Sequence, residues 1–145
     1  MLNAVKSLIL NANPYKILVD FEKAAMNSFQ QVYPLATITG CYFHLCQSVL
    51  RKVNEIGMKR EYENNPDMRS FIRCFPALAF VPTDDVSAAY DRLVETAVHH
   101  SLTPNLHQQV GTFLNFFENT YIRGKRLRGP GRGRIYAEAL FLFLI

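Results

Sequence analysis

The chain has 145 residues, of which 49% are hydrophobic and 19% are charged. This composition is typical of one globular domain or part of one, and it argues against an intrinsically disordered chain. The formal net charge is +4, and six Arg or Lys residues with no acid lie between Arg123 and Arg134; removing these six charges leaves −2 for the remainder. The basic segment is compatible with binding to nucleic acid, with binding to an acidic partner, or with simple solvation.

The cysteines and the two ends of the chain indicate which cellular compartment suits the protein. Three cysteines without a secretory signal indicate a reducing compartment, because an odd and small number does not suit a disulfide scaffold. Residues 1–10 lack the charged front and the cleavage site of a signal peptide. The apolar run 139–145 is far shorter than the roughly 20 residues of a membrane span, so we expect no membrane association. We interpret it as a buried strand, or as a sequence that ends before its structural context does.

The first part of the chain predicts helices and strands in alternation. A helix is expected over 2–9, and 16–20 is a short apolar run ending in an acid, as in a buried parallel strand. The following segments predict a helix over 22–33, a strand over 36–39 and a helix over 44–58 that Gly57 caps. Strand, helix, strand and helix with short joints favour an α/β unit with parallel strands.

The next part predicts helices without strands. Asn65 and Pro66 are a helix start signal, and Pro76 is expected to kink or split that helix. Thr83 is expected to cap a second helix, and Thr103 with Pro104 starts a third. The buried faces are expected at Leu45, Val49, Val53 and Ile56, then Met68, Phe71, Ile72 and Phe75, then Val86, Tyr90, Leu93 and Ala97, and then Leu106, Val110, Phe113, Phe117 and Tyr121. The glycine- and arginine-rich stretch 124–134 predicts a flexible basic loop.

An ordered set of motifs runs through these elements. It comprises Asp20-Phe-Glu-Lys-Ala24, Tyr33-Pro34, Gly40-Cys-Tyr-Phe-His-Leu-Cys-Gln47, Arg51-Lys52, Ala77-Leu-Ala-Phe-Val-Pro82 and Phe116-Phe-Glu-Asn-Thr-Tyr121. The set resembles the catalytic domain of Mutator-like (MULE) transposases, including FLYWCH-associated and domesticated relatives, over residues 17–121. The spacing between Asp-Phe-Glu and Gly-Cys-x-Phe-His is the most specific part of this resemblance.

The resemblance implies a fold and an activity. The expected fold class is α/β, a fragment of a ribonuclease H-like fold in which a short parallel sheet with helices precedes an all-helical insertion. We expect a partial catalytic core over 1–62, the helical insertion over 63–122, and a basic loop with an apolar tail over 123–145. The implied activity is DNA cleavage and strand transfer (DNA transposition) in the nucleus by an Asp-Asp-Glu (DDE) triad with two Mg²⁺ or Mn²⁺ ions, acting on transposon ends. Protein partners are a further expectation.

The resemblance assigns roles to three residues. Asp20 matches the second catalytic aspartate and is the expected metal ligand, while Cys41 and His44 match the family's Cys-x-x-His motif. Without the motif, Asp20 would be interpreted as a strand-end cap or a solvated turn acid. The family's first aspartate and final glutamate have no counterpart here, because Glu118 and Glu138 lie in other contexts. We therefore expect the chain to be inactive alone.

Several alternatives stay open at this stage. Glu22 is interpreted as an acid of the first helical turn rather than a ligand, and a zinc site at Cys41 and His44 with Cys46 or Cys74 is disfavoured by the spacing. A hydrogen-bonded His44 is the favoured structural interpretation. Candidate contacts to nucleic acid are Arg123, Lys125, Arg126, Arg128, Arg132 and Arg134. The alternative functions are a non-catalytic domesticated DNA- or protein-binding module, or a fragment without a stable fold.

Overall fold

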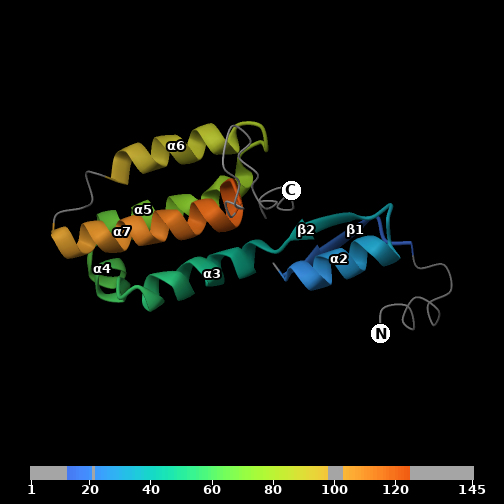
Figure 1. The fold of residues 1–145 in the computed structure, drawn as a ribbon, viewed down its shortest axis with the longest axis horizontal. Helices are drawn as coiled ribbons and strands as arrows, with labels where there is room; N and C mark the ends of the chain where they lie inside the picture. Colours follow the sequence, from blue (N-terminus) through green and yellow to red (C-terminus); the bar gives the residue numbers. More distant parts are fainter. Residues whose placement is uncertain (1–12, 21, 98–102, 125–145) are drawn as a thin grey trace, which may run out of the picture.

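A computed structural model describes residues 13–20, 22–97 and 103–124. It is a mixed structure, mostly helical, with a short parallel sheet of two strands (Figure 1). The order is β1 (Lys16–Val19), α2 (Lys23–Val32), β2 (Thr37–Gly40), α3 (Tyr42–Glu55), α4 (Lys59–Asn64), α5 (Pro66–Ala77), a 3₁₀ helix (Leu78–Phe80), α6 (Val86–Thr96), α7 (Pro104–Phe117) and a π-helix (Glu118–Ile122). The helix expected over 2–9, the loop over 125–134, Glu138 and the apolar run 139–145 lie outside the described residues.

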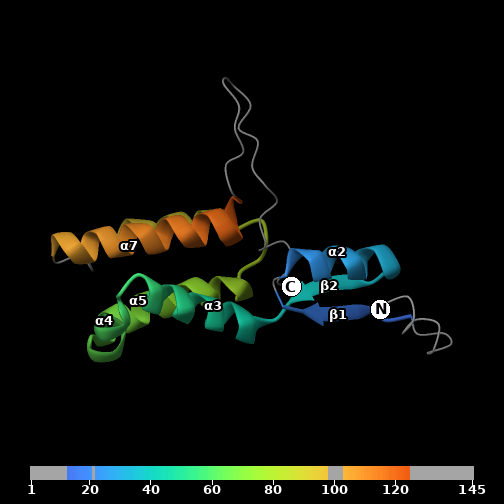
Figure 2. The ribbon, with the colours of Figure 1, turned by 60° about the horizontal axis from the view of Figure 1, so that its bottom comes forward.

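The two strands are parallel, as the sequence predicts, but the sheet is less buried than expected. Ile17 pairs with Ile38 in the ladder, and α2 covers the face that these residues share with Val19 (Figure 2). Leu18 points to the opposite face and is 65% exposed. The expectation of a fully buried first strand is therefore wrong for one face, because α2 packs on only one side of the sheet within the described residues.

The helices α3 to α7 share one hydrophobic core, separate from the small cluster between α2 and the sheet. Figures 1 and 2 show α3, α5 and α7 lying along one another, with the sheet and α2 beyond the first turn of α3. Phe75 of α5 lies at the centre of this core, and its ring is 5.0 Å from that of Phe113 and 5.3 Å from that of Phe117. The junction between β2 and α3 therefore separates the small hydrophobic cluster of the sheet and α2 from the larger core of the helices.

The caps of α5 and α7 confirm two helix start signals. Asn65 Oδ1 accepts hydrogen bonds from the backbone N–H groups of Asp67 and Met68, and Thr103 Oγ1 accepts one from Leu106. At the end of α3, Gly57 adopts a φ of 76°, a left-handed conformation that favours glycine. These three predictions succeed because each depends on hydrogen bonds or dihedral angles within one turn of chain.

Two helix boundaries differ from the sequence predictions. Thr83 does not cap α6, since the N-cap residue is Asp85 and makes no side-chain cap hydrogen bond. Residues 83–85 form a turn in which the Asp85 N–H donates to the Pro82 carbonyl, so the helix begins later than expected. At Pro76, where a kink or a split was expected, the α-helix itself ends: Pro76 lies in the last turn of α5, which stops at Ala77 and passes into a 3₁₀ helix.

The end of α7 widens into a π-helix over Glu118–Ile122. Such wide turns shift the following side chains around the helix axis and are frequent at functional sites. Here the wide turn buries Tyr121 against the ring of Phe117, at 5.0 Å between ring centroids. Among the residues with described structure, no helix has the length and apolarity needed to cross a membrane.

Candidate functional site

The ends of the two parallel strands bring the main motif residues together. Val19 pairs with Gly40, and the N–H of Cys41 donates a hydrogen bond of 2.9 Å to the carbonyl of Val19. Asp20 and Cys41 therefore leave the sheet side by side, at its carboxyl edge. The Cys-x-x-His motif then enters α3, with Cys41 at the N-cap position and His44 in the first turn.

A pocket of about 530 Å³ opens beside these strand ends. Its lining is polar and comes from the strand end, α3 and the π-helix. The lining residues are Asp20, Glu22, His44, Gln47, Ser48, Arg51, Thr120 and Tyr121. The structure thus places Asp20 and His44, both predicted as site residues, in one cavity. Cys41 stands at the adjoining strand end but is not among the lining residues.

One face of α3 supplies half of this lining. His44, Gln47, Ser48 and Arg51 follow one another at spacings of three, one and three residues, which puts them on one side of a helix. The opposite side of α3 carries Leu45, Val49 and Val53, which are buried in the helical core. The burial of these apolar residues fixes the rotation of α3 and turns its polar face toward Asp20.

The π-helix closes the far side of the pocket. Tyr121 donates a hydrogen bond of 2.8 Å from its hydroxyl to Ser48 Oγ, which ties the end of α7 to the middle of α3. Burial raises the pKa of Tyr121, while the hydrogen bond to Ser48 and the charge of Arg51 lower it. The neighbouring Thr120 also lines the pocket, so the π-helix that follows α7 contributes directly to this site.

His44 differs from the interpretation made from the sequence. Its Nδ1 atom is buried and has no hydrogen-bond partner among the described residues, although a hydrogen-bonded ring was expected. The ring lies edge-on to Phe43, with 5.8 Å between ring centroids.

The acids of the pocket do not assemble a complete metal site in the described part of the chain. Within it, no group of three or more His, Cys, Asp or Glu side chains is arranged to hold a metal ion. Glu22 occupies the N-cap position of α2, one residue before the first turn predicted for it, and makes no side-chain cap hydrogen bond. Cys41, Cys46 and Cys74 are free thiols.

Charge is distributed unevenly over the pocket. Asp20 and Glu22 lie at the strand end, and Arg51 lies two helical turns along α3 from His44. The ion pairs formed by the described residues do not include Arg51, so neither acid is within ion-pair distance of its guanidinium. The cavity therefore has an acidic end and a basic end.

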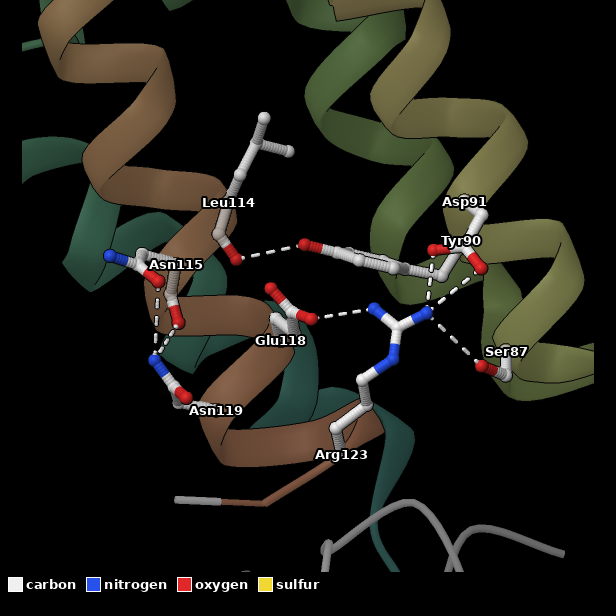
Figure 3. A network of polar contacts seen from close by, with 8 residues as sticks. All are labelled: Ser87, Tyr90, Asp91, Leu114, Asn115, Glu118, Asn119 and Arg123. Carbon is white, nitrogen blue, oxygen red and sulfur yellow. Dashed lines mark hydrogen bonds and ion pairs between the residues drawn. The ribbon is translucent and has the colours of Figure 1, made fainter. Parts of the chain in front are cut away.

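Arg123, predicted as a contact to nucleic acid, lies in a network of polar contacts (Figure 3). Its guanidinium forms ion pairs of 2.6 Å with Asp91 and with Glu118, and it lies 5.6 Å from the ring centroid of Tyr90. These contacts join α6 to the end of α7. Lys125, Arg126, Arg128, Arg132 and Arg134 lie outside the described residues.

Sequence reasoning did not single out Gln47, Ser48, Arg51 or Thr120 as site residues, although all but Ser48 belong to the quoted motifs. The helical spacing from His44 to Arg51 is a signal that could have found three of these residues. Thr120 had no such signal, because its place in the pocket depends on the packing of α7 against α3 and on the π-helix.

Comparison with known proteins adds no family assignment. The chain matches no model of a known protein family, no curated protein and no solved structure. The function of the pocket is therefore argued from its residues and their geometry.

Proposed function

We propose that this chain is a piece of a MULE-type transposase domain, with a ribonuclease H-like origin for the sheet and α2. In this proposal Asp20 is the second carboxylate of a DDE triad, and the intact domain performs metal-dependent DNA cleavage and strand transfer. The observation that carries the proposal is the hydrogen bond from the Cys41 N–H to the Val19 carbonyl. It supports the proposal because it joins the two most specific motifs, Asp-Phe-Glu and Cys-x-x-His, at one edge of a parallel sheet.

The position of Asp20 suits a ligand of a divalent metal ion. It is an exposed carboxylate at the carboxyl end of a strand, and hard oxygen ligands of this kind bind Mg²⁺ and Mn²⁺. When bound in an intact domain, the metal ions would polarise the phosphate and activate the attacking oxygen. His44, in the first turn of α3, lines the same cavity as Asp20, so these two motif residues have a shared location.

The described residues do not fit a complete two-metal centre. One strand-end aspartate with Glu22 and His44 nearby falls short of the three acids that the family uses, and no group of three potential ligands occurs in the described ranges. We propose that the chain alone does not cleave DNA.

A second function, that of a non-catalytic DNA-binding module, is favoured by one observation. Arg51 presents an exposed guanidinium to the pocket without an ion-pair partner in the described chain. A domain that had lost cleavage could still use this basic end of the pocket. Both proposals share DNA as the ligand and differ in whether Asp20 binds a metal ion.

Metal binding at Asp20 is the sharpest test of the main proposal. Mn²⁺ is titrated into the ¹⁵N-labelled chain, and the loss of backbone amide signals by paramagnetic relaxation is followed residue by residue. We expect selective loss around Asp20 and Cys41, and we expect Asp20→Asn to abolish it. The matched control is Asp67→Asn, an exposed carboxylate on α5 that should leave the effect unchanged.

The outcome that contradicts this proposal is equally specific. If the amides near Cys41 lose signal to the same extent in Asp20→Asn, or keep it in the unmodified chain, Asp20 is not a metal ligand. A separate assay incubates the chain with terminal-repeat DNA and Mg²⁺ or Mn²⁺, and neither nicking nor joining is expected. Cleavage that disappears in Asp20→Ala would show that the chain is active by itself.

A further inference from the structure

We propose that the basic end of the pocket, formed by Arg51 with Gln47 and Thr120, binds a backbone phosphate of the DNA strand. This inference rests on the proposed function for the identity of the ligand. It goes beyond that function because it assigns a substrate contact to residues outside the DDE triad and the Cys-x-x-His motif. The three side chains line one cavity and together offer a guanidinium, an amide and a hydroxyl, all of which donate hydrogen bonds.

The charge of Arg51 is available, whereas other cations around it are already engaged. Lys52, the next residue, pairs with Glu55 at 2.8 Å and lies 5.3 Å from the ring centroid of Phe116. Arg123 pairs with two carboxylates. Arg51 is exposed and forms no ion pair with the described residues. An unpaired guanidinium in a concave polar site is a suitable ligand for a phosphate group.

The surroundings of Arg51 hold it at the pocket. The α3 backbone that carries Arg51 is held in place by Val49 and Val53, which are buried on the side of the helix opposite the pocket. The hydrogen bond from Tyr121 to Ser48 attaches the π-helix one turn before Arg51. Burial raises the pKa of that tyrosine, and the positive charge of Arg51 opposes this rise. Arg51 therefore extends from a helix, rather than from a loop, into the cavity that Thr120 also lines.

The length of the pocket suits a strand of DNA. From His44 to Arg51 the helix rises by about 10 Å, at roughly 1.5 Å per residue. Successive phosphates of one strand are spaced by about 3.4 Å along the duplex axis. For a duplex whose axis runs parallel to α3, this rise spans roughly three nucleotides, and His44 lines the pocket together with the strand-end acids, which in the proposed function hold a metal ion. The acidic and basic ends thus suit a metal-bound phosphodiester and a second phosphate roughly three nucleotides away on the same strand.

The experiment measures binding of the whole chain to a short DNA duplex in EDTA, so that no metal ion contributes. We expect Arg51→Gln to weaken binding by about three- to tenfold and to lower the slope of log K against log salt by about 1, uniformly across DNA sequences. Arg51→Lys keeps the charge without the planar fork and should fall between the two. The matched control is Arg60→Gln, an exposed arginine on α4 outside the pocket, which should bind as the unmodified chain does.

The location of the DNA contact on the chain is measured separately from the binding affinity. In ¹⁵N spectra of the unmodified chain, addition of the duplex should shift the amide signals of Gln47 and Thr120 and the Nε–H signal of Arg51. No shift at these three groups overturns the proposal, as does equal binding by Arg51→Gln and Arg60→Gln. Spectra of each variant without DNA verify its fold, and the shifts at Gln47 and Thr120 decide the matter if Arg51→Gln does not fold.

This test and the test of the proposed function fail in different ways. Loss of the Arg51 effect while Mn²⁺ still acts at Asp20 removes only the phosphate site. Persistence of the Arg51 effect with no Mn²⁺ effect at Asp20 removes only the metal assignment, and it leaves the non-catalytic DNA-binding module as the function.

Discussion

Arg123 binds Asp91 through a single nitrogen, with Nη2 at 2.6 Å from Oδ1 and 2.8 Å from Oδ2 of the carboxylate. The same guanidinium reaches Glu118 through Nη1 at 2.6 Å (Figure 3). Asp91 belongs to α6 and Glu118 to the π-helix, so one side chain connects two elements that are distant in sequence. The contacts of Asp91 and Glu118 raise the pKa of Arg123, against the effect of desolvation, which ensures that the charge persists at any ordinary pH.

We predict that Arg123→Gln lowers the free energy of unfolding by about 1 kcal/mol at low salt, since partly exposed ion pairs contribute little and the Tyr90 ring adds a modest cation–π term. A double-mutant cycle with Asp91→Asn, followed by urea unfolding, measures the coupling between the two residues. Arg92→Gln, at the next and exposed position of α6, is the control and should have little effect. A coupling energy near zero, or one that does not shrink with added salt, would contradict the ion-pair account.

The caps of the helices give a second prediction. Asn65→Ala should lower the free energy of unfolding by about 1 kcal/mol, because two N–H groups of α5 lose their acceptor. Thr103→Ala should have a similar effect on α7. Thr83→Ala should have almost none, since Thr83 makes no cap in the structure. Chemical unfolding of the three variants checks the order, and an equal loss at Thr83 would place the start of α6 at Thr83 after all.

The aromatic core gives a third prediction. Phe75→Ala should lower the free energy of unfolding by about 3–5 kcal/mol, because a fully buried ring that contacts Phe113 and Phe117 leaves a cavity when removed. Phe80→Ala removes a ring that is 74% exposed and should cost well under about 1 kcal/mol. Thermal unfolding of both variants gives the comparison, and similar losses would argue against the core as described.

Alkaline pH gives a fourth prediction. Burial raises the pKa of Tyr90 well above its ordinary value of 10, and Glu118 adds to this effect while Arg123 opposes it. A raised folded-state pKa means that the neutral phenol, which donates to the Leu114 carbonyl at 3.0 Å, is favoured in the folded chain. The stability from this group is complete below about pH 10 and is lost as the pH rises toward the folded-state pKa.

We therefore expect the free energy of unfolding to fall above about pH 10, by up to roughly 1.4 kcal/mol per pH unit for each such tyrosine. Tyr90→Phe should flatten this dependence, although loss of the hydrogen bond should lower stability at neutral pH by about 1 kcal/mol. Tyr15→Phe, at a residue that is 84% exposed, serves as the control. Urea unfolding across the alkaline range is the measurement, and a slope that Tyr90→Phe leaves unchanged would exclude Tyr90 as its source.

Local patterns predicted the parts of the fold that depend on a few neighbouring residues. The apolar spacing of Leu45, Val49 and Val53 gave the buried side of α3, and the Asn65 and Thr103 caps gave two helix starts. The exposure of Leu18 was not predictable in this way, because it depends on which elements cover the sheet. The wide turn after Phe117 likewise has no local signal as clear as a glycine or a cap.

The residues of the candidate site also fall into those that sequence patterns predicted and those that depend on contacts between distant segments. Asp20 and His44 were predicted, and the structure puts them in one pocket, because the parallel pairing of β1 and β2 brings the end of β1 beside the start of α3. The contribution of Thr120 required contacts between α3 and a segment more than 60 residues later, as in the Tyr121–Ser48 hydrogen bond. For Arg123, sequence pattern indicated a free basic residue, whereas its carboxylate partner Asp91 comes from another helix.

The continuity of α3 has a mechanical consequence. Its fourteen residues form one rod of about 21 Å that begins at the sheet and ends inside the helical core. A tilt of that rod by about 5° displaces one end relative to the other by roughly 2 Å. His44 and Arg51 travel together on the rod, while Asp20 stays with β1. A movement of the helical core that tilts α3 would therefore change the distance between Asp20 and Arg51, at the two charged ends of the pocket.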